Sequence, residues 1–173
     1  MVVKICISGL TGSGKTTISE RVASDMGLLH VKNSYKDYLS ENKKLTSFID
    51  ETDEEFVKNF DMKTIEMASK EDCVISTWLS PWLIKDATLR IWLYAQDEVR
   101  VKRYMRRENI EDENDARARM LEIDRTAIEH FKKFYVVDIT NHDDFDLQIN
   151  TGKISIDGSV SLISSALKEK MRR

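Results

Sequence analysis

A glycine-rich octapeptide near the amino terminus restricts the fold of this 173-residue chain more than any other feature. It reads Gly9-Leu-Thr-Gly-Ser-Gly-Lys-Thr16 and follows directly after an apolar run from Val2 to Ile7. The pattern G-x-x-x-x-G-K-T after a buried strand is typical of a phosphate-binding loop, in which backbone N–H groups and a helix N-terminus face a polyphosphate. The alternative is a strand-to-helix turn that needs glycine only for its shape. The apolar run before the motif favours the phosphate site.

The chemistry of this motif assigns roles to its residues. Lys15 is expected to reach the β- and γ-phosphates of ATP or GTP, and the hydroxyl of Thr16 to bind Mg²⁺ as the cofactor. We place nucleotide binding at Gly9, Thr11, Gly12, Ser13, Gly14, Lys15, Thr16 and Thr17.

Length and composition predict a single domain over residues 1–173. Charged residues make up 33% of the chain, but the net charge is −3, so no overall basic field favours a nucleic-acid partner. Cys6 and Cys73 lie in apolar runs without metal-ligand spacing, and we expect both to be reduced. The chain has no signal-type segment and no apolar stretch long enough to span a membrane. A cytoplasmic protein without a membrane partner is expected.

Short β-branched runs alternate with longer stretches of helical period, which is typical of an α/β fold with a parallel sheet between helices. The strands are predicted at residues 2–8, 28–31, 72–77, 89–95 and 145–150. The helices are predicted at residues 14–26, 54–70, 97–108, 113–133 and 158–171. Gly27 is a natural end for the first of these helices.

Two polar segments, residues 32–61 and 107–120, do not fit the bare sheet. One interpretation is that both are solvated excursions, as runs of charge usually are. The other starts from Arg100, Arg103 and Arg107, which share one helix face with Arg106 beside them. Guanidinium groups gathered on one face suit an anionic ligand, so this region and Arg125 beyond it are candidates to cover phosphates. The sequence leaves both interpretations open.

The order of these segments resembles that of the P-loop nucleoside monophosphate kinases, which include adenylate kinase, and most closely the archaeal-type cytidylate kinases. The likeness continues after the fourth strand in Val99-Arg-Val-Lys-Arg-Tyr-Met-Arg-Arg-Glu108. Further on, Phe131-Lys-Lys-Phe-Tyr-Val-Val-Asp138 and Phe145-Asp-Leu-Gln-Ile-Asn-Thr151 are similar to the family stretches R-Y-K-x-x-Y-G-I-D and Y-D-L-V-I-N-T. The resemblance implies a three-layer P-loop fold, with a monophosphate-binding arm at 32–61 and a short mobile lid at 107–120.

The resemblance also implies roles for single residues. Arg103 matches an arginine that packs against the base of ATP, and Arg107 and Arg125 match lid arginines that contact the transferring phosphates. Lys15, Arg107 and Arg125 are therefore the expected catalytic residues. Asp61 and Lys63 match the aspartate and an arginine of a D-R-R stretch near the acceptor nucleotide.

The chain departs from the family pattern at the acceptor site. Ser76-Thr77-Trp78-Leu79 replaces E-G-R-L, so an acidic residue and an acceptor-phosphate arginine are both missing. Trp78 cannot pair with a phosphate as arginine does, and is expected either to stack on an acceptor base or to pack in the core. Trp82 is expected in the core. His130 stands in place of an arginine, and Val136 in place of a glycine.

The leading functional prediction is ATP-dependent transfer of the γ-phosphoryl group to a nucleoside monophosphate. The resemblance favours CMP or dCMP as acceptor, with AMP as another candidate; the partners are then a nucleoside triphosphate and a nucleoside monophosphate, bound to a monomer or homodimer. A second reading keeps the fold but places a hydroxyl group at the acceptor site, with Asp61 as the base. A third is a nucleotide-binding regulatory module that has lost the acceptor arginine.

Overall fold

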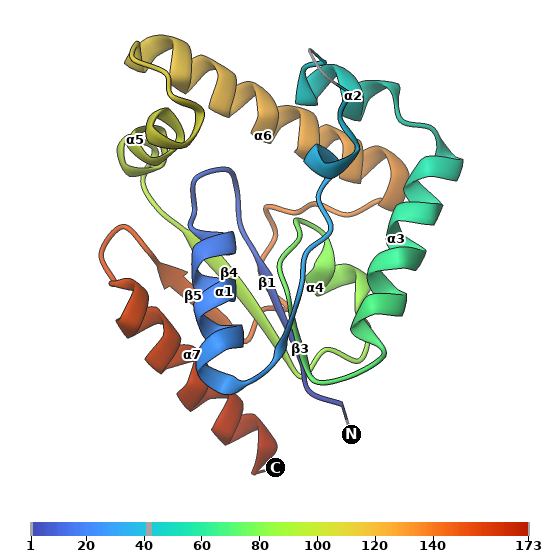
Figure 1. Cartoon of the computed structure of the whole chain (residues 1–173), viewed down its shortest axis with the longest axis vertical. Helices are drawn as coiled ribbons and strands as arrows, with labels where there is room; N and C mark the ends of the chain where they lie inside the picture. Colours follow the sequence, from blue (N-terminus) through green and yellow to red (C-terminus); the bar gives the residue numbers. More distant parts are fainter. Residues whose placement is uncertain (1, 41–42, 173) are drawn as a thin grey trace.

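The computed structural model describes residues 2–40 and 43–172, and its centre is a sheet of five parallel strands (Figure 1). The strands are β1 (Lys4–Ser8), β2 (Leu29–Val31), β3 (Cys73–Ile75), β4 (Leu89–Tyr94) and β5 (Leu147–Asn150). Their order across the sheet is β2-β3-β1-β4-β5, and every neighbouring pair is parallel. All carboxyl ends of the strands therefore meet at one edge, which is where ligands bind in open α/β sheets.

The longer helices are α1 (Lys15–Met26), α3 (Glu54–Ala68), α5 (Asp97–Glu108), α6 (Glu113–Tyr135) and α7 (Ile156–Met171). Shorter ones are η1 (Tyr35–Tyr38), a single 3₁₀ turn, and the α-helices α2 (Leu45–Glu51) and α4 (Ser80–Leu83). Local chemistry sets their ends. Gly27 ends α1 in the left-handed conformation, with φ of 65°, and its N–H caps two carbonyls of the last turn. The side chain of Asp112 caps the start of α6 by accepting a hydrogen bond from the N–H of Asp115.

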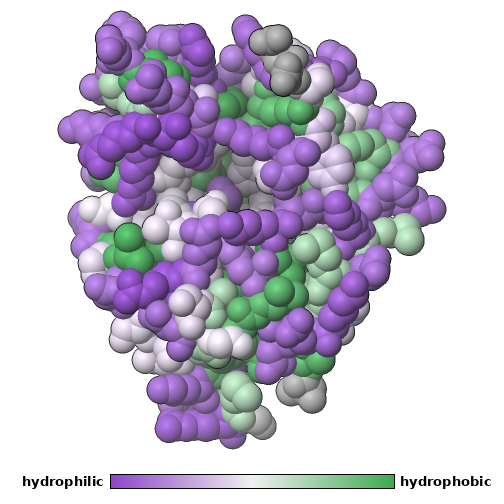
Figure 2. All heavy atoms as spheres, in the orientation of Figure 1, coloured by the Kyte–Doolittle hydropathy of each residue, from purple (hydrophilic) through white to green (hydrophobic). Residues whose placement is uncertain are grey.

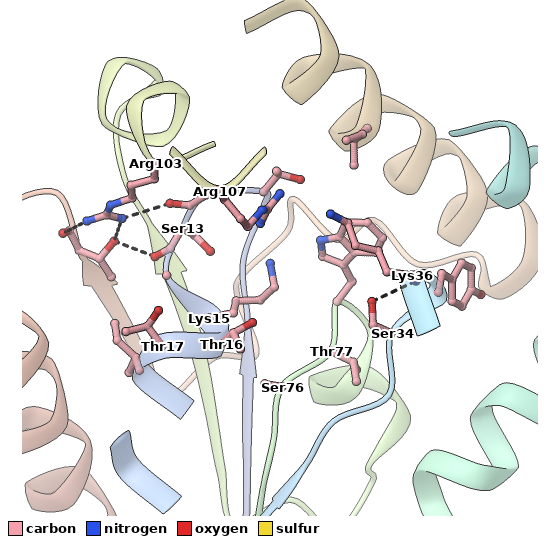
Figure 3. Close-up of a pocket in the computed structure, with 18 of the residues that line it drawn as sticks. Ser13, Lys15, Thr16, Thr17, Ser34, Lys36, Ser76, Thr77, Arg103 and Arg107 are labelled. Atoms are coloured by element: carbon pink, nitrogen blue, oxygen red, sulfur yellow. Dashed lines mark hydrogen bonds between the residues drawn. The ribbon is translucent and has the colours of Figure 1, made fainter. Parts of the chain in front are cut away.

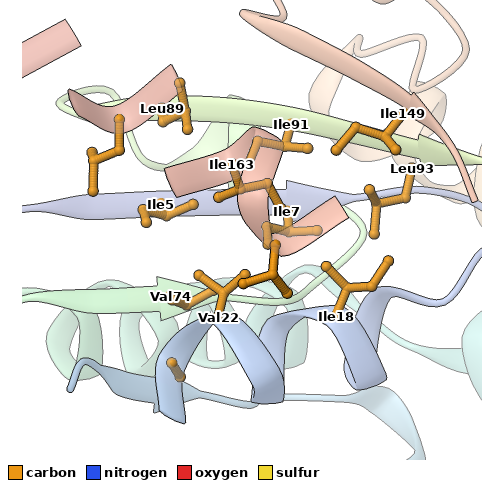
Figure 4. Close-up of a cluster of buried hydrophobic side chains, with 13 residues drawn as sticks. Ile5, Ile7, Ile18, Val22, Val74, Leu89, Ile91, Leu93, Ile149 and Ile163 are labelled. Atoms are coloured by element: carbon orange, nitrogen blue, oxygen red, sulfur yellow. The ribbon is translucent and has the colours of Figure 1, made fainter. Parts of the chain in front are cut away.

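Helices α1 and α7 cover one face of the sheet, where most of the core lies (Figure 4). The cluster joins Ile18 and Val22 of α1 and Ile163 of α7 to strand residues such as Ile5 and Ile7. Because β1 is also covered on its other face, its sequence is apolar almost throughout, as expected for a central parallel strand.

Helices α3 and α4 cover the opposite face, which completes the three layers. Cys6 and Cys73 pack there against Val31, Ala68 and Ile84, and both are free and buried. Burial raises the pKa of the Cys6 thiol to about 12, so the group stays protonated and packs as a small apolar side chain. Within the described residues, no helix combines the length and apolarity needed to cross a membrane.

Helices α5, α6 and α2 lie above the carboxyl edge of the sheet (Figure 1). Helix α2, from the 32–61 arm, packs against α6, and Leu45 contacts a cluster formed by α5 and α6. The members of that cluster are Val101, Tyr104, Ala116, Met120 and Ile123. The arm and the start of α6 are thus parts of one packed roof, and a space remains between this roof and the sheet.

The predicted α/β fold, with a parallel sheet between helices, is confirmed. All five predicted strands and all five predicted helices are present, with ends shifted by a few residues. The sequence patterns missed η1, α2 and α4, because each is too short to show a helical period.

Candidate active site

A cleft of about 860 Å³ lies between the roof and the carboxyl edge of the sheet. Figure 2 shows it as a hollow between the upper helices and the sheet, with mostly hydrophilic side chains around it. We call its two sides the loop wall, which is Thr11–Thr17 with Arg103, and the aromatic wall. The aromatic wall is formed by Tyr35, Phe60, Trp78 and Phe131 together with Asp61.

The loop wall depends on glycine at two positions. A Cβ atom on Gly9, where φ is 153°, would lie 2.2 Å from the carbonyl oxygen of Leu93. A Cβ atom on Gly12, where φ is 77°, would lie 2.8 Å from the carbonyl oxygen of Arg100 in α5. Both distances are closer than atoms can approach, so any other residue would push the loop away from β4 or α5. The loop is therefore shaped by its backbone and by the elements packed around it.

A buried ion pair clamps this loop from behind. The guanidinium of Arg100 lies 2.6 Å from the carboxylate of Asp124 in α6, and both side chains are almost fully buried. Arg100 also donates to the carbonyl oxygen of Thr11, while the N–H of Thr11 donates to Asp124. The shared helix face of Arg100, Arg103 and Arg107 predicts that Arg100 helps to cover phosphates. The structure contradicts this, because the donors of Arg100 are bound within the protein and its side chain does not line the cleft.

Arg103 joins the loop to the end of β5. Its guanidinium donates to the carbonyl oxygen of Gly12 and to both oxygens of Thr151, at 2.7–3.1 Å. The Thr151 hydroxyl in turn donates to the carbonyl oxygen of Ser13 (Figure 3). Arg103 lines the cleft while it holds these contacts, so it can present its flat face to a ligand without losing its position.

Lys15 projects from the start of α1 into the cleft, next to the side chain of Thr16 (Figure 3). Its ammonium group donates to the carbonyl oxygens of Gly9 and Leu10. Removal from water lowers the pKa of Lys15 to about 7, and the positive charge of Arg107 adds to this effect. The site is therefore short of negative charge, and a polyphosphate would supply it.

The aromatic wall carries one carboxylate. Asp61 lines the cleft and accepts a hydrogen bond of 2.5 Å from the Tyr135 hydroxyl. Partial burial raises the pKa of Asp61, and the hydrogen bond from Tyr135 opposes that rise. Behind it, Tyr35 packs edge to face on Phe60 and bonds through its hydroxyl to His130. His130 thus has a structural partner, and burial lowers its pKa to about 4, so it is neutral at pH 7.

Trp78 lies where the two walls meet. Its ring packs against Phe131 and lies 5.8 Å from the ammonium nitrogen of Lys15. The residue lines the cleft and also contacts two apolar clusters, so both sequence interpretations of Trp78 describe part of its environment. Trp82 packs on Phe145 away from the cleft, and it is partly buried at the edge of an apolar cluster rather than enclosed in the core.

Most of the predicted site residues come together in this cleft. Those that line it are Thr11, Gly12, Ser13, Gly14, Lys15, Thr16, Thr17, Asp61, Trp78, Arg103 and Arg107, while Gly9 supports the loop from below.

Lys63 and Arg125 do not line the cleft. Lys63 lies over the ring of Tyr38 and donates to its hydroxyl, and Arg125 is exposed on α6. The same helical geometry explains both residues. Lys63 follows Asp61, and Arg125 follows Ile123, by two positions on a helix. Two positions turn a side chain by about 200°, so it points away from the cleft. Their roles near the acceptor and at the transferring phosphates stay predictions, and in this structure neither side chain lines the cleft.

Sequence reasoning missed Asp124, Thr151, Lys36 and Glu108. Asp124 left a signal, since it is an acidic residue in the buried stripe of α6 that includes Met120, Ile123 and Ala127. The other three acquire their roles from partners that are distant in the sequence, and no local pattern marks them.

The fold and the site together define a P-loop nucleotide kinase: a parallel sheet whose first strand leads into a phosphate loop, facing an aromatic wall across a cleft. The model of the cytidylate kinase-like family matches residues 29–153, and the chain belongs to that family of nucleoside monophosphate kinases. It is 34% identical to the cytidylate kinase of Pyrococcus horikoshii, over 94% of this chain and 87% of that enzyme. It is 31% identical to the cytidylate kinase of Archaeoglobus fulgidus, over 97% and 96% of the two chains.

Solved structures share the fold at lower identity. Deoxyadenosine kinase from M. mycoides matches with a TM-score of 0.61 at 15% identity, over 96% of this chain and 100% of that one. Shikimate kinase from Acinetobacter baumannii also matches with a TM-score of 0.61 at 15% identity, over 98% and 96%.

Proposed function

We propose that this protein transfers the γ-phosphoryl group of ATP to a nucleoside monophosphate, with CMP or dCMP as the first acceptors to test. The observation that carries this proposal is the continuity of the cleft. One space joins the phosphate loop to an aromatic wall that can receive a base, and it lies at the edge of the sheet where the strands end. The cytidylate kinases among the relatives supply the choice of acceptor.

The charges in the cleft suit phosphoryl transfer. The transition state spreads negative charge over the phosphoryl oxygens, so the protein needs positioning and positive charge more than a base. Lys15, Arg103 and Arg107 line the cleft with this charge, and a monophosphate acceptor is already an anionic nucleophile. Arg103 would stay bound to Thr151 and present its guanidinium plane to the donor base.

The residues around Lys15 also fit Mg²⁺. Thr16 is exposed at the first turn of α1, next to the space that the phosphates would fill. Magnesium ions in such sites are held by one or two protein oxygens and by substrate phosphates, so an all-protein cage is not needed. Thr16 would hold the ion, which supplies charge neutralisation between the β- and γ-phosphates.

A second candidate is transfer to a hydroxyl group, and one observation favours it. Asp61 is the one acidic residue among the described residues that line the cleft, and a carboxylate placed there can act as a general base. Trp78 adds no charge to the aromatic wall where the family pattern has an arginine.

An acceptor panel distinguishes these functions. The purified chain is incubated with ATP, Mg²⁺ and CMP, dCMP, AMP, UMP, cytidine or deoxyadenosine, and the products are separated by chromatography. Formation of a nucleoside diphosphate supports the proposal, and formation of a monophosphate from a nucleoside supports the second candidate. ATP binding without any transfer would favour a nucleotide-binding regulatory module.

Tryptophan emission reports where the acceptor binds. If CMP stacks at Trp78, its addition changes the emission of the parent chain and of Trp82→Phe, and most of this change disappears in Trp78→Phe. An equal change in both variants would place the acceptor away from Trp78 and contradict the proposed site.

A further inference from the structure

An ion-pair chain of three residues connects the 32–61 arm to the end of α5. The ammonium nitrogen of Lys36 lies 2.8 Å from one oxygen of Glu108, and the Nε of Arg107 donates to the same oxygen at 2.7 Å. Lys36 belongs to η1, whereas Arg107 and Glu108 are the last two residues of α5. Elements distant in the sequence thus bring two cations to one carboxylate.

The two cations face the cleft and the carboxylate does not. Lys36 and Arg107 line the cleft (Figure 3). Glu108 is not among the residues that line it. Arg107 uses its Nε for Glu108, so the two terminal nitrogens of its guanidinium are free of that contact. The Lys36 ammonium has three donors, of which Glu108 takes one. Glu108 can therefore hold both cations side by side while several of their N–H groups remain for a ligand.

Both cations share the cleft with Lys15 of the phosphate loop. The positive charge of Arg107 also helps to lower the pKa of Lys15, although removal from water is the larger cause. Lys36 is the one cation among the described arm residues that line the cleft. A phosphate held by Lys36 and Arg107 would therefore lie in the same cleft as the phosphate loop.

We propose that Lys36 and Arg107, held together by Glu108, bind the phosphate of the acceptor and replace the arginine that Trp78 displaces. The inference rests on the proposed function and names the binding site of its acceptor. A bidentate guanidinium is replaced by two single cations from different elements, with Glu108 as a positioning residue that offsets their mutual repulsion. The pair recognises a doubly charged phosphate, and the aromatic wall recognises the base.

Calorimetric titration of the full chain with CMP and with cytidine tests this inference. For Lys36→Ala we expect the Kd of CMP to rise by about tenfold or more, because a charge-assisted hydrogen bond is lost. The Kd of cytidine, which has no phosphate, is unchanged. Lys36→Arg keeps most of the CMP affinity, since it preserves the charge. The matched control is Lys43→Ala, which removes another arm lysine that pairs with a glutamate, Glu51, outside the cleft; both Kd values stay at the parental level.

The Glu108→Ala variant tests whether Glu108 positions Lys36 and Arg107 for the phosphate or only competes with the phosphate for them. If Glu108 positions the cations, CMP binds several-fold more weakly and cytidine binds as before. Tighter CMP binding would mean that Glu108 only competes with phosphate, and would overturn its role. CMP affinity unchanged in Lys36→Ala would overturn the phosphate site while leaving the proposed function intact. A parent chain that binds none of CMP, dCMP, AMP and UMP would overturn both proposals.

Discussion

The loop wall and the aromatic wall face the same cleft but are built from different parts of the chain. The loop wall is made largely of backbone from one short segment, and buried polar contacts from Arg100, Arg103 and Thr151 hold it in place. The aromatic wall is made of side chains from the arm, from the segment after β3 and from α6. These side chains are four aromatic residues and one carboxylate, Asp61.

This difference explains why the loop wall can be predicted from the sequence more completely than the aromatic wall. Backbone N–H groups are the same in every residue, so a phosphate site made from them needs only glycine spacing, a lysine and a hydroxyl. A wall of side chains can be replaced one residue at a time, as the change of arginine to Trp78 illustrates. We expect the loop wall to tolerate little change and the aromatic wall to define the acceptor.

The largest expected effect is at the loop wall. Lys15→Ala removes the charge that meets the β- and γ-phosphates, and phosphoryl transfer should fall by about a hundredfold to a thousandfold or more. Its contacts in the free protein are to two carbonyl oxygens, so the melting temperature should change little. Steady-state kinetics and thermal unfolding measure the two effects. A variant with near-parental transfer would contradict the assignment of the phosphate site.

The buried clamp behind the loop should affect stability most. Asp124→Ala leaves the Arg100 guanidinium with the half-exposed Asp97 as its remaining carboxylate partner and leaves the Thr11 N–H without the acceptor that Asp124 provides. Loss of one partner from a buried pair costs about 3–5 kcal/mol, so we expect a loss of about 3 kcal/mol in urea unfolding. The control is Arg119→Ala, which breaks an exposed pair with Asp115 and should cost about 0.5 kcal/mol or less. Equal losses in the two variants would mean that the clamp adds nothing.

Nucleotide binding should depend on pH through Lys15. Its pKa is lowered to about 7 in the free protein, and a polyphosphate favours the charged form and raises it. Binding therefore takes up a proton, and ATP affinity falls as the pH rises from 7 to 9, by at most about tenfold per pH unit. Calorimetry in buffers of different ionisation heat measures the uptake. Lys15→Arg, which stays charged, should remove it; an equal uptake in that variant would assign the proton to another group.

The smallest expected effect concerns Val136, which follows Tyr135, the residue that donates a hydrogen bond to Asp61. It has a φ of 55°, in the left-handed region, and it is 89% exposed. The left-handed conformation costs a residue other than glycine about 1–2 kcal/mol, while glycine costs about 0.5–1 kcal/mol in chain entropy. Val136→Gly should therefore stabilise the protein by about 0.5–1 kcal/mol in urea unfolding.

Asn109 supplies the comparison, because it ends α5 with nearly the same φ of 54°. Asparagine tolerates this conformation, so Asn109→Gly should change stability much less than Val136→Gly. A destabilised Val136→Gly variant would show that the valine side chain makes a contribution that outweighs its backbone strain.

Much of the fold could be predicted from the sequence because its signals are local. The strands are short apolar runs, the long helices carry clear periods, and Gly27 marks the end of α1. The phosphate loop is continuous in sequence, so its residues come together wherever the motif folds. The resemblance also predicts Asp61 and Trp78 near the acceptor, and both residues line the cleft.

The rest of the site depends on packing between distant segments. Lys63 and Arg125 do not line the cleft because of helical phase: the packing of α3 and α6 turns Asp61 and Ile123 toward the cleft, and a residue two positions further on then points away. Arg100 shares a helix face with Arg103, but the arrival of Asp124 from α6 turns it into a structural residue. Lys36 becomes a cleft cation only because η1 lies opposite the end of α5.

The packing of α2 against α6 gives the two halves of the cleft a common support. Helix α6 also carries Asp124, which clamps the phosphate loop, and Phe131, which belongs to the aromatic wall. A nucleotide that restricts the motion of α6 from one side reduces the entropy that the second ligand has left to lose. Thermodynamic linkage then makes the effect reciprocal: the factor by which donor changes acceptor affinity equals the factor by which acceptor changes donor affinity. If the proposed donor and acceptor both restrict α6, we therefore expect each to change the affinity of the other.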